Sequence, residues 1–169
     1  DTQSGEKETL ERLISFKVPK KWSGWVAYQT QPETEKQDPS NDEKAKKASA
    51  ENGYTLNIKN LNGETEQFPF VTGYRFAKEE EVLIFASTGN DKDFEAGVYR
   101  YDLDSEEPTP LMLGKAQYTQ LSISDDGSLA AFVSDSTSNE QAKGHALYLW
   151  NGKDQARQVV QNDLKTMPE

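Results

Sequence analysis

One pattern of apolar strands and polar loops recurs three times along this chain of 169 residues. In each copy, a short apolar run is followed by a polar loop and then by a second strand-like run. The paired runs are residues 25–28 and 56–61, residues 82–86 and 98–103, and residues 129–133 and 147–152. A recurrence of short strands at intervals of roughly 40–50 residues predicts an all-β fold built from similar small sheets.

Repeats of this length and content are typical of a β-propeller. We therefore expect an all-β fold, an incomplete β-propeller of about three four-stranded antiparallel blades. The predicted limits are residues 16–71 for blade 1, residues 72–114 for blade 2 and residues 115–160 for blade 3. Because propellers have about four to eight blades, three cannot close a ring.

The second strand of each unit gives a further argument for stacked sheets. Residues 82–86 are continuously apolar rather than alternating, which is typical of a strand covered on both faces. In a propeller, each blade packs against two neighbours, so its middle strands meet that condition. The sheets of a lone sandwich would instead expose one face each and would show cleaner alternation.

The segments outside the predicted strands are polar. Residues 1–15 are expected to be a tail with a short N-terminal helix over residues 6–15, because Leu10, Leu13 and Ile14 have helical spacing. Residues 161–169 are expected to be a linker to a missing blade.

Three loops join a second strand to a third strand, namely residues 31–52, 88–96 and 134–144. Residues 31–52 are a long polar stretch that buries almost nothing. In blades of up-and-down topology, the three loops leave the same side of the stack, so we expect any partner or substrate entrance there.

Charge and composition exclude some classes of function. The formal net charge is −10, which disfavours nucleic acid and anionic membrane surfaces as partners. The chain has no cysteine and no apolar run of 18 residues, so disulfides, thiolate metal sites and a membrane-spanning helix are not expected. It begins at Asp1 without a visible signal peptide, and we expect it to be processed or cut from a longer protein.

No motif in the sequence predicts a catalytic, cofactor or metal site. His145 is the one histidine and has no nucleophile motif near it, so we interpret it as structural. Asp91, Asp93 and Glu95 alternate like the start of a calcium loop, but Ala96 stands where that loop needs glycine. We therefore expect a solvated acidic loop.

The remaining candidate residues also have a structural interpretation. Asp102, Asp104, Glu106 and Glu107 are explained by the turn preference of acidic residues. Residues 125–127 (Asp-Asp-Gly) are expected to form a hairpin turn whose carboxylates point outward, unlike the facing pair of a glycosidase. Trp22, Trp25 and Trp150 could stack on sugars or peptides, but the strand positions of Trp25 and Trp150 favour core packing.

Residues 121–135 read as an apolar strand, an Asp-Gly turn, a second apolar strand and a Ser-Asp pair. This order resembles the blade motif of Tol-type periplasmic propellers and of propellers in the prolyl oligopeptidase family. Residues 97–103 with residues 111–115, and the lysine-containing loop before residues 54–61, are similar to the N-terminal propeller region of large secreted bacterial peptidases of that family.

The resemblance implies an α/β-hydrolase catalytic domain elsewhere in the full protein, with this segment gating or filtering the access of peptide substrates. It also implies a periplasmic or secreted location. The chain itself has no Gly-x-Ser-x-Gly nucleophile elbow, so no catalytic residue of the family is carried onto it and we do not expect it to be an enzyme. The alternative is a stand-alone propeller module that binds a protein or glycan. Exposed blade edges would also favour a homo-oligomer.

Overall fold

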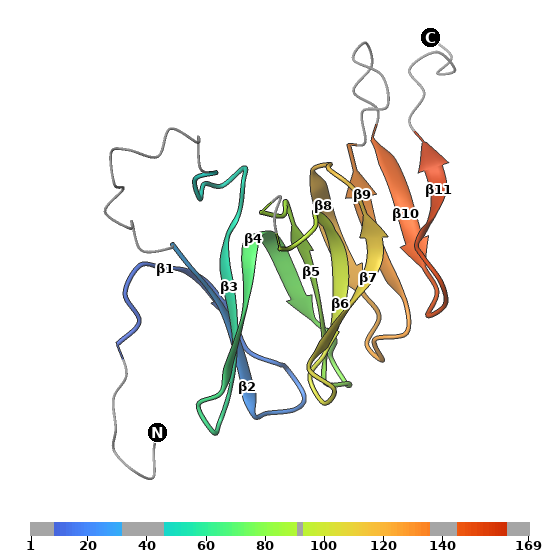
Figure 1. Ribbon diagram of the computed structural model, residues 1–169. Helices are drawn as coiled ribbons and strands as arrows, with labels where there is room; N and C mark the ends of the chain where they lie inside the picture. Colours follow the sequence, from blue (N-terminus) through green and yellow to red (C-terminus); the bar gives the residue numbers. More distant parts are fainter. Residues whose placement is uncertain (1–8, 32–45, 91–92, 136–144, 162–169) are drawn as a thin grey trace.

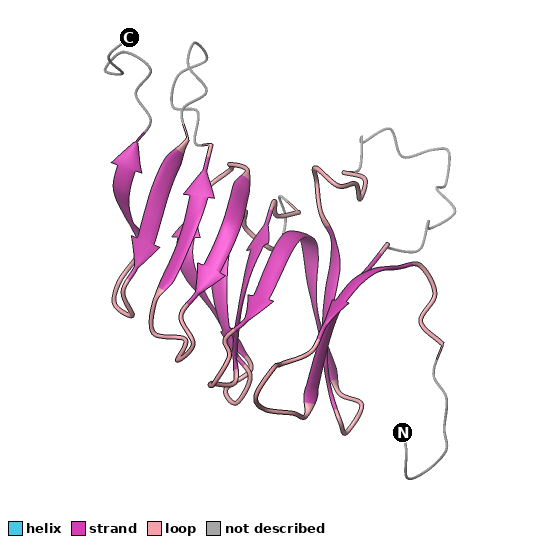
Figure 2. Ribbon diagram, turned by 180° about the vertical axis from the view of Figure 1, so that it is seen from behind, coloured by secondary structure: helices cyan, strands magenta, loops and turns pink. Residues whose placement is uncertain are grey.

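A computed structural model of the chain describes residues 9–31, 46–90, 93–135 and 145–161. The regular structure of these residues is antiparallel β-sheet, and none of them forms a helix (Figures 1 and 2). The strands are β1 (Leu13–Lys17), β2 (Trp25–Thr30), β3 (Tyr54–Asn60), β4 (Thr65–Phe76), β5 (Val82–Ser87), β6 (Gly97–Asp102), β7 (Glu107–Leu113), β8 (Tyr118–Ile123), β9 (Ala130–Ser134), β10 (Ala146–Trp150) and β11 (Arg157–Gln161).

The strands form two sheets in which every strand pairs with its neighbours in sequence. One sheet has seven strands in the order β1 to β7, and the other has four, β8 to β11. All pairings are antiparallel, so the chain runs up and down throughout. This meander, repeated as separate layers along the molecule, is the architecture of an incomplete propeller, as predicted (Figure 1).

Strand β4 links the first two layers. Its first half pairs with β3 through Phe68↔Leu56, and its second half pairs with β5 through Tyr74↔Phe85. Between these halves Phe70 has a φ of +50°, and the pairing with β5 shifts register. The first layer is therefore β1 to β4 and the second is β4 to β7, joined in one sheet, and the blade limit predicted at residue 71 falls inside β4.

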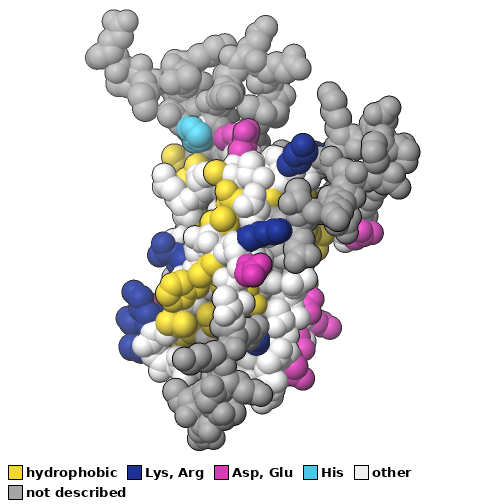
Figure 3. Space-filling view, turned by 90° about the vertical axis from the view of Figure 1, so that its left-hand side faces the viewer, with side chains coloured by type: hydrophobic (Ala, Val, Ile, Leu, Met, Phe, Trp, Pro, Cys, Tyr) yellow, Lys and Arg dark blue, Asp and Glu magenta, His cyan; other side chains and the backbone are white. Residues whose placement is uncertain are grey.

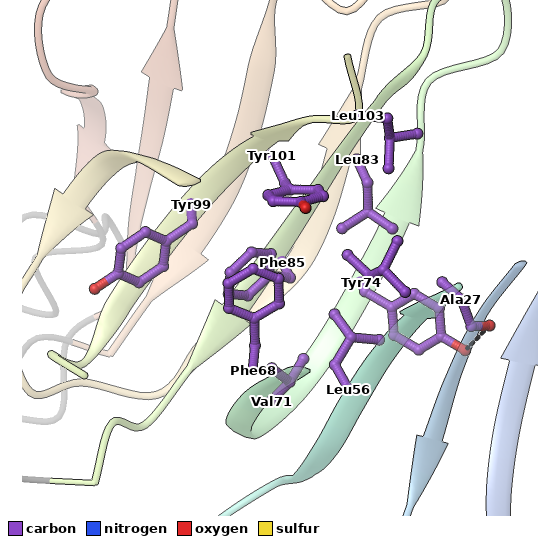
Figure 4. Packing of buried hydrophobic residues seen from close by; sticks show 11 residues of the cluster. Ala27, Leu56, Phe68, Val71, Tyr74, Leu83, Phe85, Tyr99, Tyr101 and Leu103 are labelled. Atoms are coloured by element: carbon purple, nitrogen blue, oxygen red, sulfur yellow. Dashed lines mark hydrogen bonds between the residues drawn. The ribbon is translucent and has the colours of Figure 1, made fainter. Parts of the chain in front are cut away.

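Two hydrophobic clusters fill the spaces between the layers. The first core lies between the first and second layers (Figure 4) and consists of Ala27, Leu56, Ile58, Phe68, Val71, Tyr74, Leu83, Phe85, Tyr99, Tyr101 and Leu103. The second core lies between the second and third layers and consists of Ile84, Ala86, Val98, Leu111, Tyr118, Ala130, Phe132 and Trp150. Each core therefore exists only because two layers face each other.

Strand β5 confirms the expectation of double burial, because all six of its residues are buried. Strand β9, in the third layer, instead alternates: Ala130 and Phe132 are buried in the second core, while Ala131 and Val133 are only half-buried. The contrast has a simple cause, since the second layer has a neighbour on both sides and the third layer has one described neighbour.

The helix predicted over residues 6–15 is wrong for its described part. Residues 13–15 are strand, and Phe16 pairs with Tyr28 on the neighbouring strand. Arg12, the turn residue before the strand, has a φ of +55°, which is incompatible with a right-handed helical turn. The main-chain N–H and C=O groups of this segment find hydrogen-bond partners on the edge of β2. This pairing stabilises the segment more than a short isolated helix would.

On the tight-turn side, lysines tie each layer to the next. Lys21 pairs with Glu79, and Lys78 Nζ lies 2.5 Å from Asp125 Oδ2. The Asp125 carbonyl also accepts hydrogen bonds from the main chain of Lys78 (3.1 Å) and Glu79 (2.8 Å). The main-chain bonds fix the position of the third layer, because surface ion pairs alone contribute at most about 1 kcal/mol each.

No helix among the described residues is long and apolar enough to cross a membrane.

Candidate functional surface

Of the three long loops, the structure describes only the β5–β6 loop at length, where residues 91–92 are outside the described residues. Asn90 Oδ1 accepts hydrogen bonds from the main chain of Asp93 (2.9 Å) and Phe94 (2.8 Å). The ring of Phe94 packs against the first core, 4.7 Å from the ring of Tyr99. This loop is therefore anchored by its own turn and by an aromatic contact.

The acidic alternation in this loop does not build a metal site in the described residues. Asp93 and Glu95 are exposed, and Asp91 lies outside the described residues. No group of three or more His, Asp or Glu that could hold a metal ion occurs in the part of the chain that the structure describes. Asp93 and Glu95 owe their positions to the turn in which Asn90 Oδ1 accepts main-chain hydrogen bonds.

Lys46, at the end of the long loop of the first layer, reaches the β5–β6 loop. Its Nζ donates hydrogen bonds to the carbonyls of Thr88 (2.7 Å) and Gly89 (2.8 Å) and lies 4.8 Å from the ring centroid of Phe70. The Thr88 hydroxyl donates to the carbonyl of Asn52. The long-loop side of the first two layers is thus held by direct contacts between loops, which positions any surface built there.

The other carboxylates singled out from the sequence lie in turns. Asp102 Oδ1 accepts main-chain hydrogen bonds from Asp104 and Ser105. Asp126 Oδ1 accepts hydrogen bonds from Ser124 Oγ (2.6 Å) and Ser128 Oγ (2.8 Å), and these contacts lower its pKa to about 2. These carboxylates are oriented by their own turns, and Asp125 and Asp126 are both exposed as expected.

His145 is exposed immediately before β10 and makes no side-chain hydrogen bond to the described residues. Trp150 is 8% exposed within the second core, and its Nε1 donates to the carbonyl of Asp154 at 3.2 Å. Trp22 and Trp25 pack against the first core, where Trp22 makes an edge contact with Phe76. Trp150 thus packs within a core, and Trp25 and Trp22 are partly buried against the first core.

A polar network that the sequence does not reveal lies where β1 crosses the second half of β4. Ser15 Oγ donates to Gln29 Oε1 (2.8 Å) and lies 3.0 Å from the hydroxyl of Tyr74. That hydroxyl donates to the Ala27 carbonyl (3.3 Å), as Figure 4 shows. Gln29 Nε2 donates to the Val71 carbonyl (2.7 Å). The network joins the inner strands of two layers.

Lys17 continues this network toward solvent. Its Nζ donates to the Tyr74 carbonyl (2.5 Å) and lies 4.4 Å from the centroid of the Tyr74 ring. Burial and the nearby Arg75 guanidinium lower the pKa of Lys17, while burial raises the pKa of Tyr74. Nothing in the sequence connects these residues, because Lys17 and Tyr74 are 57 positions apart.

Comparison with solved structures relates this architecture to propellers of peptidases. The chain is similar to the β-propeller domain of the Trilobed protease from Pyrococcus furiosus, with 14% identity and a TM-score of 0.54 over 88% of this chain and 42% of that chain. It is also similar to Pyrococcus horikoshii acylaminoacyl peptidase, with 16% identity and a TM-score of 0.53 over 88% of this chain and 25% of that one.

At these identities the similarity establishes the propeller fold, and the chain spans less than half the length of either structure. No family model and no curated protein matches the sequence.

Proposed function

We propose that this chain is a non-catalytic propeller segment of a larger peptidase, where it limits which peptides reach a catalytic domain carried elsewhere. The layered fold and the similarity to a protease propeller and an acylaminoacyl peptidase support this proposal. The sequence has no Gly-x-Ser-x-Gly nucleophile elbow, which is why the proposal assigns the chemistry to another domain.

The observation that carries the proposal is the open outer face of the third layer. Leu147 and Leu149 on β10 and Val160 on β11 are exposed. The corresponding face of the second layer is covered by the third layer and forms the second core. A face of this kind is expected to pack against a further layer or domain, because a propeller has about four to eight blades.

The first test uses the purified chain with fluorogenic peptide and ester substrates and an active-site-directed serine-hydrolase probe. We expect neither turnover nor labelling. Turnover that the probe abolishes would contradict the non-catalytic assignment.

The continuation of the gene beyond residue 169 gives a second test. A nucleophile elbow downstream supports the peptidase, whereas an early stop codon favours the stand-alone binding module for a protein or glycan.

The gating role itself is tested in the full-length protein. Phe85→Ala removes a large side chain from the first core, and Leu61→Ala at an exposed turn is the control. If the propeller excludes large substrates, Phe85→Ala will raise hydrolysis of a long peptide relative to a tetrapeptide, and Leu61→Ala will not. An unchanged ratio in a folded Phe85→Ala protein would contradict gating.

The resemblance to secreted peptidases also leads us to propose a periplasmic or secreted location, which cell fractionation tests directly. The same open faces lead us to propose that the isolated chain associates with itself.

A further inference from the structure

Three Asn-Gly pairs occur in the sequence, and all of them lie between strands. They are Asn52-Gly53 before β3, Asn62-Gly63 between β3 and β4, and Asn151-Gly152 between β10 and β11. An asparagine before glycine readily loses its side-chain amide, because glycine has no Cβ to hinder the approach of its own main-chain nitrogen. The three pairs share this chemistry, so the structure around each decides its rate.

The reaction needs only water as a second reactant. The main-chain nitrogen of the glycine gives its proton to solvent and attacks Cγ of the asparagine side chain. A bond forms between this nitrogen and Cγ, the bond from Cγ to Nδ2 breaks, and Nδ2 takes up a proton and leaves as ammonia. Water then opens the cyclic imide at either carbonyl, which gives aspartate or isoaspartate without oxidation or reduction.

Hydrogen bonds at two groups slow the first step. A bonded glycine N–H must be released before its nitrogen can lose the proton, and a bonded asparagine amide must be released before Cγ can turn toward that nitrogen. The net contribution of one such hydrogen bond corresponds to a rate difference of about twofold to tenfold. The hydrogen bonds of each pair therefore predict the order in which the three asparagines react.

The pair Asn52-Gly53 is held at both groups. The Gly53 N–H donates to the Ser49 carbonyl (2.7 Å), and Nδ2 of Asn52 donates to the Lys47 carbonyl (2.8 Å). Gly53 is also buried against the main chain of Phe70. This pair cannot rearrange unless the surrounding loop opens, so we expect it to be the slowest.

The pair Asn62-Gly63 is held at one group. The Gly63 N–H donates to the Asn60 carbonyl (3.1 Å). The side chain of Asn60 supports the same turn, because its Oδ1 accepts from the main chain of Asn62 (2.9 Å) and Glu64 (3.1 Å). The side chain of Asn62 itself is exposed and makes no hydrogen bond to the described residues. An intermediate rate follows.

The pair Asn151-Gly152 is held at neither group. Both residues are exposed, and neither the Gly152 N–H nor the Asn151 side chain forms a hydrogen bond with the described part of the chain. The pair directly follows Trp150, which packs in the second core. The reactive groups are thus free to meet while the strand beside them stays in place.

We propose that Asn151 is a site of spontaneous modification, where the folded chain forms aspartate and isoaspartate faster than at Asn62 and much faster than at Asn52. Isoaspartate adds one carbon atom to the main chain between Trp150 and Asp154. These two residues are joined by the hydrogen bond from Trp150 Nε1 to the Asp154 carbonyl (3.2 Å), so the modification disturbs a contact that holds this loop to the second core. The proposal does not depend on the peptidase function.

The modification is detectable as a change in total charge. Each product carboxylate adds one negative charge to a chain whose net charge is −10. On the face of the molecule that Figure 3 shows, basic and acidic side chains are interspersed with apolar ones and form no separate patch. Anion exchange therefore separates the products by their added charge.

The test is incubation of the folded chain in mildly alkaline water enriched in oxygen-18, followed by digestion in ordinary water and mass spectrometry of the peptides. Heavy oxygen in a product marks a residue that reacted before digestion. We expect Asn151 to react about twofold to tenfold faster than Asn62 and more than about tenfold faster than Asn52. In guanidinium chloride, where these hydrogen bonds are lost, the three rates should become similar.

Two variants, both checked for folding by circular dichroism, test the cause of this order. Asn151→Gln should abolish modification at residue 151 and leave the rate at Asn62 unchanged. Asn60→Ala removes the side chain that supports the turn of Asn62 and should raise the rate at Asn62 about twofold to tenfold, with no change at Asn151.

The proposal is overturned if Asn151 stays intact in the folded chain while it reacts in guanidinium chloride. It is also overturned if Asn62 or Asn52 reacts as fast as Asn151 in the folded chain. An unchanged rate at Asn62 in a folded Asn60→Ala chain would show that hydrogen bonding does not set the order, which contradicts the argument for Asn151.

Discussion

Ile84 and Phe85 are neighbours on β5, yet their side chains enter different hydrophobic cores. Ile84 packs in the second core, and Phe85 packs in the first core against Phe68, with the ring centroids 4.6 Å apart. Because successive side chains of a strand point to opposite faces, a strand between two layers needs an apolar residue at every position. This single strand therefore couples the stability of all three layers.

Truncation of either neighbour should destabilise the chain strongly. We expect Ile84→Ala to lower the free energy of unfolding by about 2–5 kcal/mol and Phe85→Ala by about 3–5 kcal/mol, since each leaves a buried cavity. Leu149→Ala on the open face of β10 should cost less than about 1 kcal/mol. Urea denaturation followed by circular dichroism measures all three. Equal losses in the three variants would contradict the two-core arrangement.

Gly53 should be the glycine least tolerant of substitution near the bend in β4. It has a φ of +93°, and a Cβ there would overlap the main chain of Phe70 and lie 2.7 Å from the carbonyl carbon of Val71. We expect Gly53→Ala to cost about 2–4 kcal/mol from backbone strain and overlap together. Gly63 has a similar φ of +91° with open space around it, so Gly63→Ala should cost only about 1–2 kcal/mol. Similar losses in urea denaturation would show that overlap contributes nothing.

Strand positions were predictable from local pattern. The continuous apolar run at residues 82–86 indicated a strand covered on both faces, and all of β5 is buried. The helix over residues 6–15 failed because pairing of Phe16 with Tyr28 depends on a partner strand that local spacing does not contain. The continuity of β4 was also hidden, because it requires a positive φ at Phe70, a residue type that rarely adopts one.

The contact between Lys17 and Tyr74 escaped prediction for a similar reason. Lys17 and Tyr74 belong to separate repeats, and neither sits in a recognisable motif. Only the stacking of the first two layers brings the Lys17 ammonium onto the ring and carbonyl of Tyr74. By contrast, Asp126 lies in a hairpin turn that local sequence specifies. The structure has this turn at the predicted residues 125–127.

The turn containing Asp126 should weaken in acid. Hydrogen bonds from Ser124 and Ser128 lower the folded pKa of Asp126 from 3.8 to about 2. A depressed carboxyl pKa stabilises the folded state above the unfolded pKa, and this contribution is lost as the pH falls from 3.8 through 2. Asp126→Asn should therefore lose less stability over that interval than the parent chain. NMR titration of the Asp126 carboxyl checks the pKa, and a normal value would contradict the turn geometry.

Buried tyrosines should make the chain sensitive to alkali. Burial is the main cause that raises the pKa of Tyr99, Tyr101 and Tyr118 from 10 to about 12. For an acid with a raised folded pKa, the stabilisation is complete below pH 10 and is lost as the pH rises through 12. In a spectrophotometric titration, these phenols should ionise last and together with unfolding. Tyr101→Phe should remove one late-titrating group, and early ionisation of all tyrosines would contradict the burial.

Self-association of the isolated chain should depend on the outer face of the third layer. Leu147, Leu149 and Val160 expose an apolar surface there, and Ile14, Phe16 and Val18 do so at the other end of the stack. Joining such faces removes apolar area from water at about 25 cal/mol per Å². Leu149→Lys should weaken association by placing a charge within the contact, whereas Leu61→Lys, at a turn residue already 86% exposed, should not. Sedimentation velocity over a range of concentrations measures both effects. If the unmodified chain stays monomeric at the highest concentration, self-association through these apolar faces is contradicted.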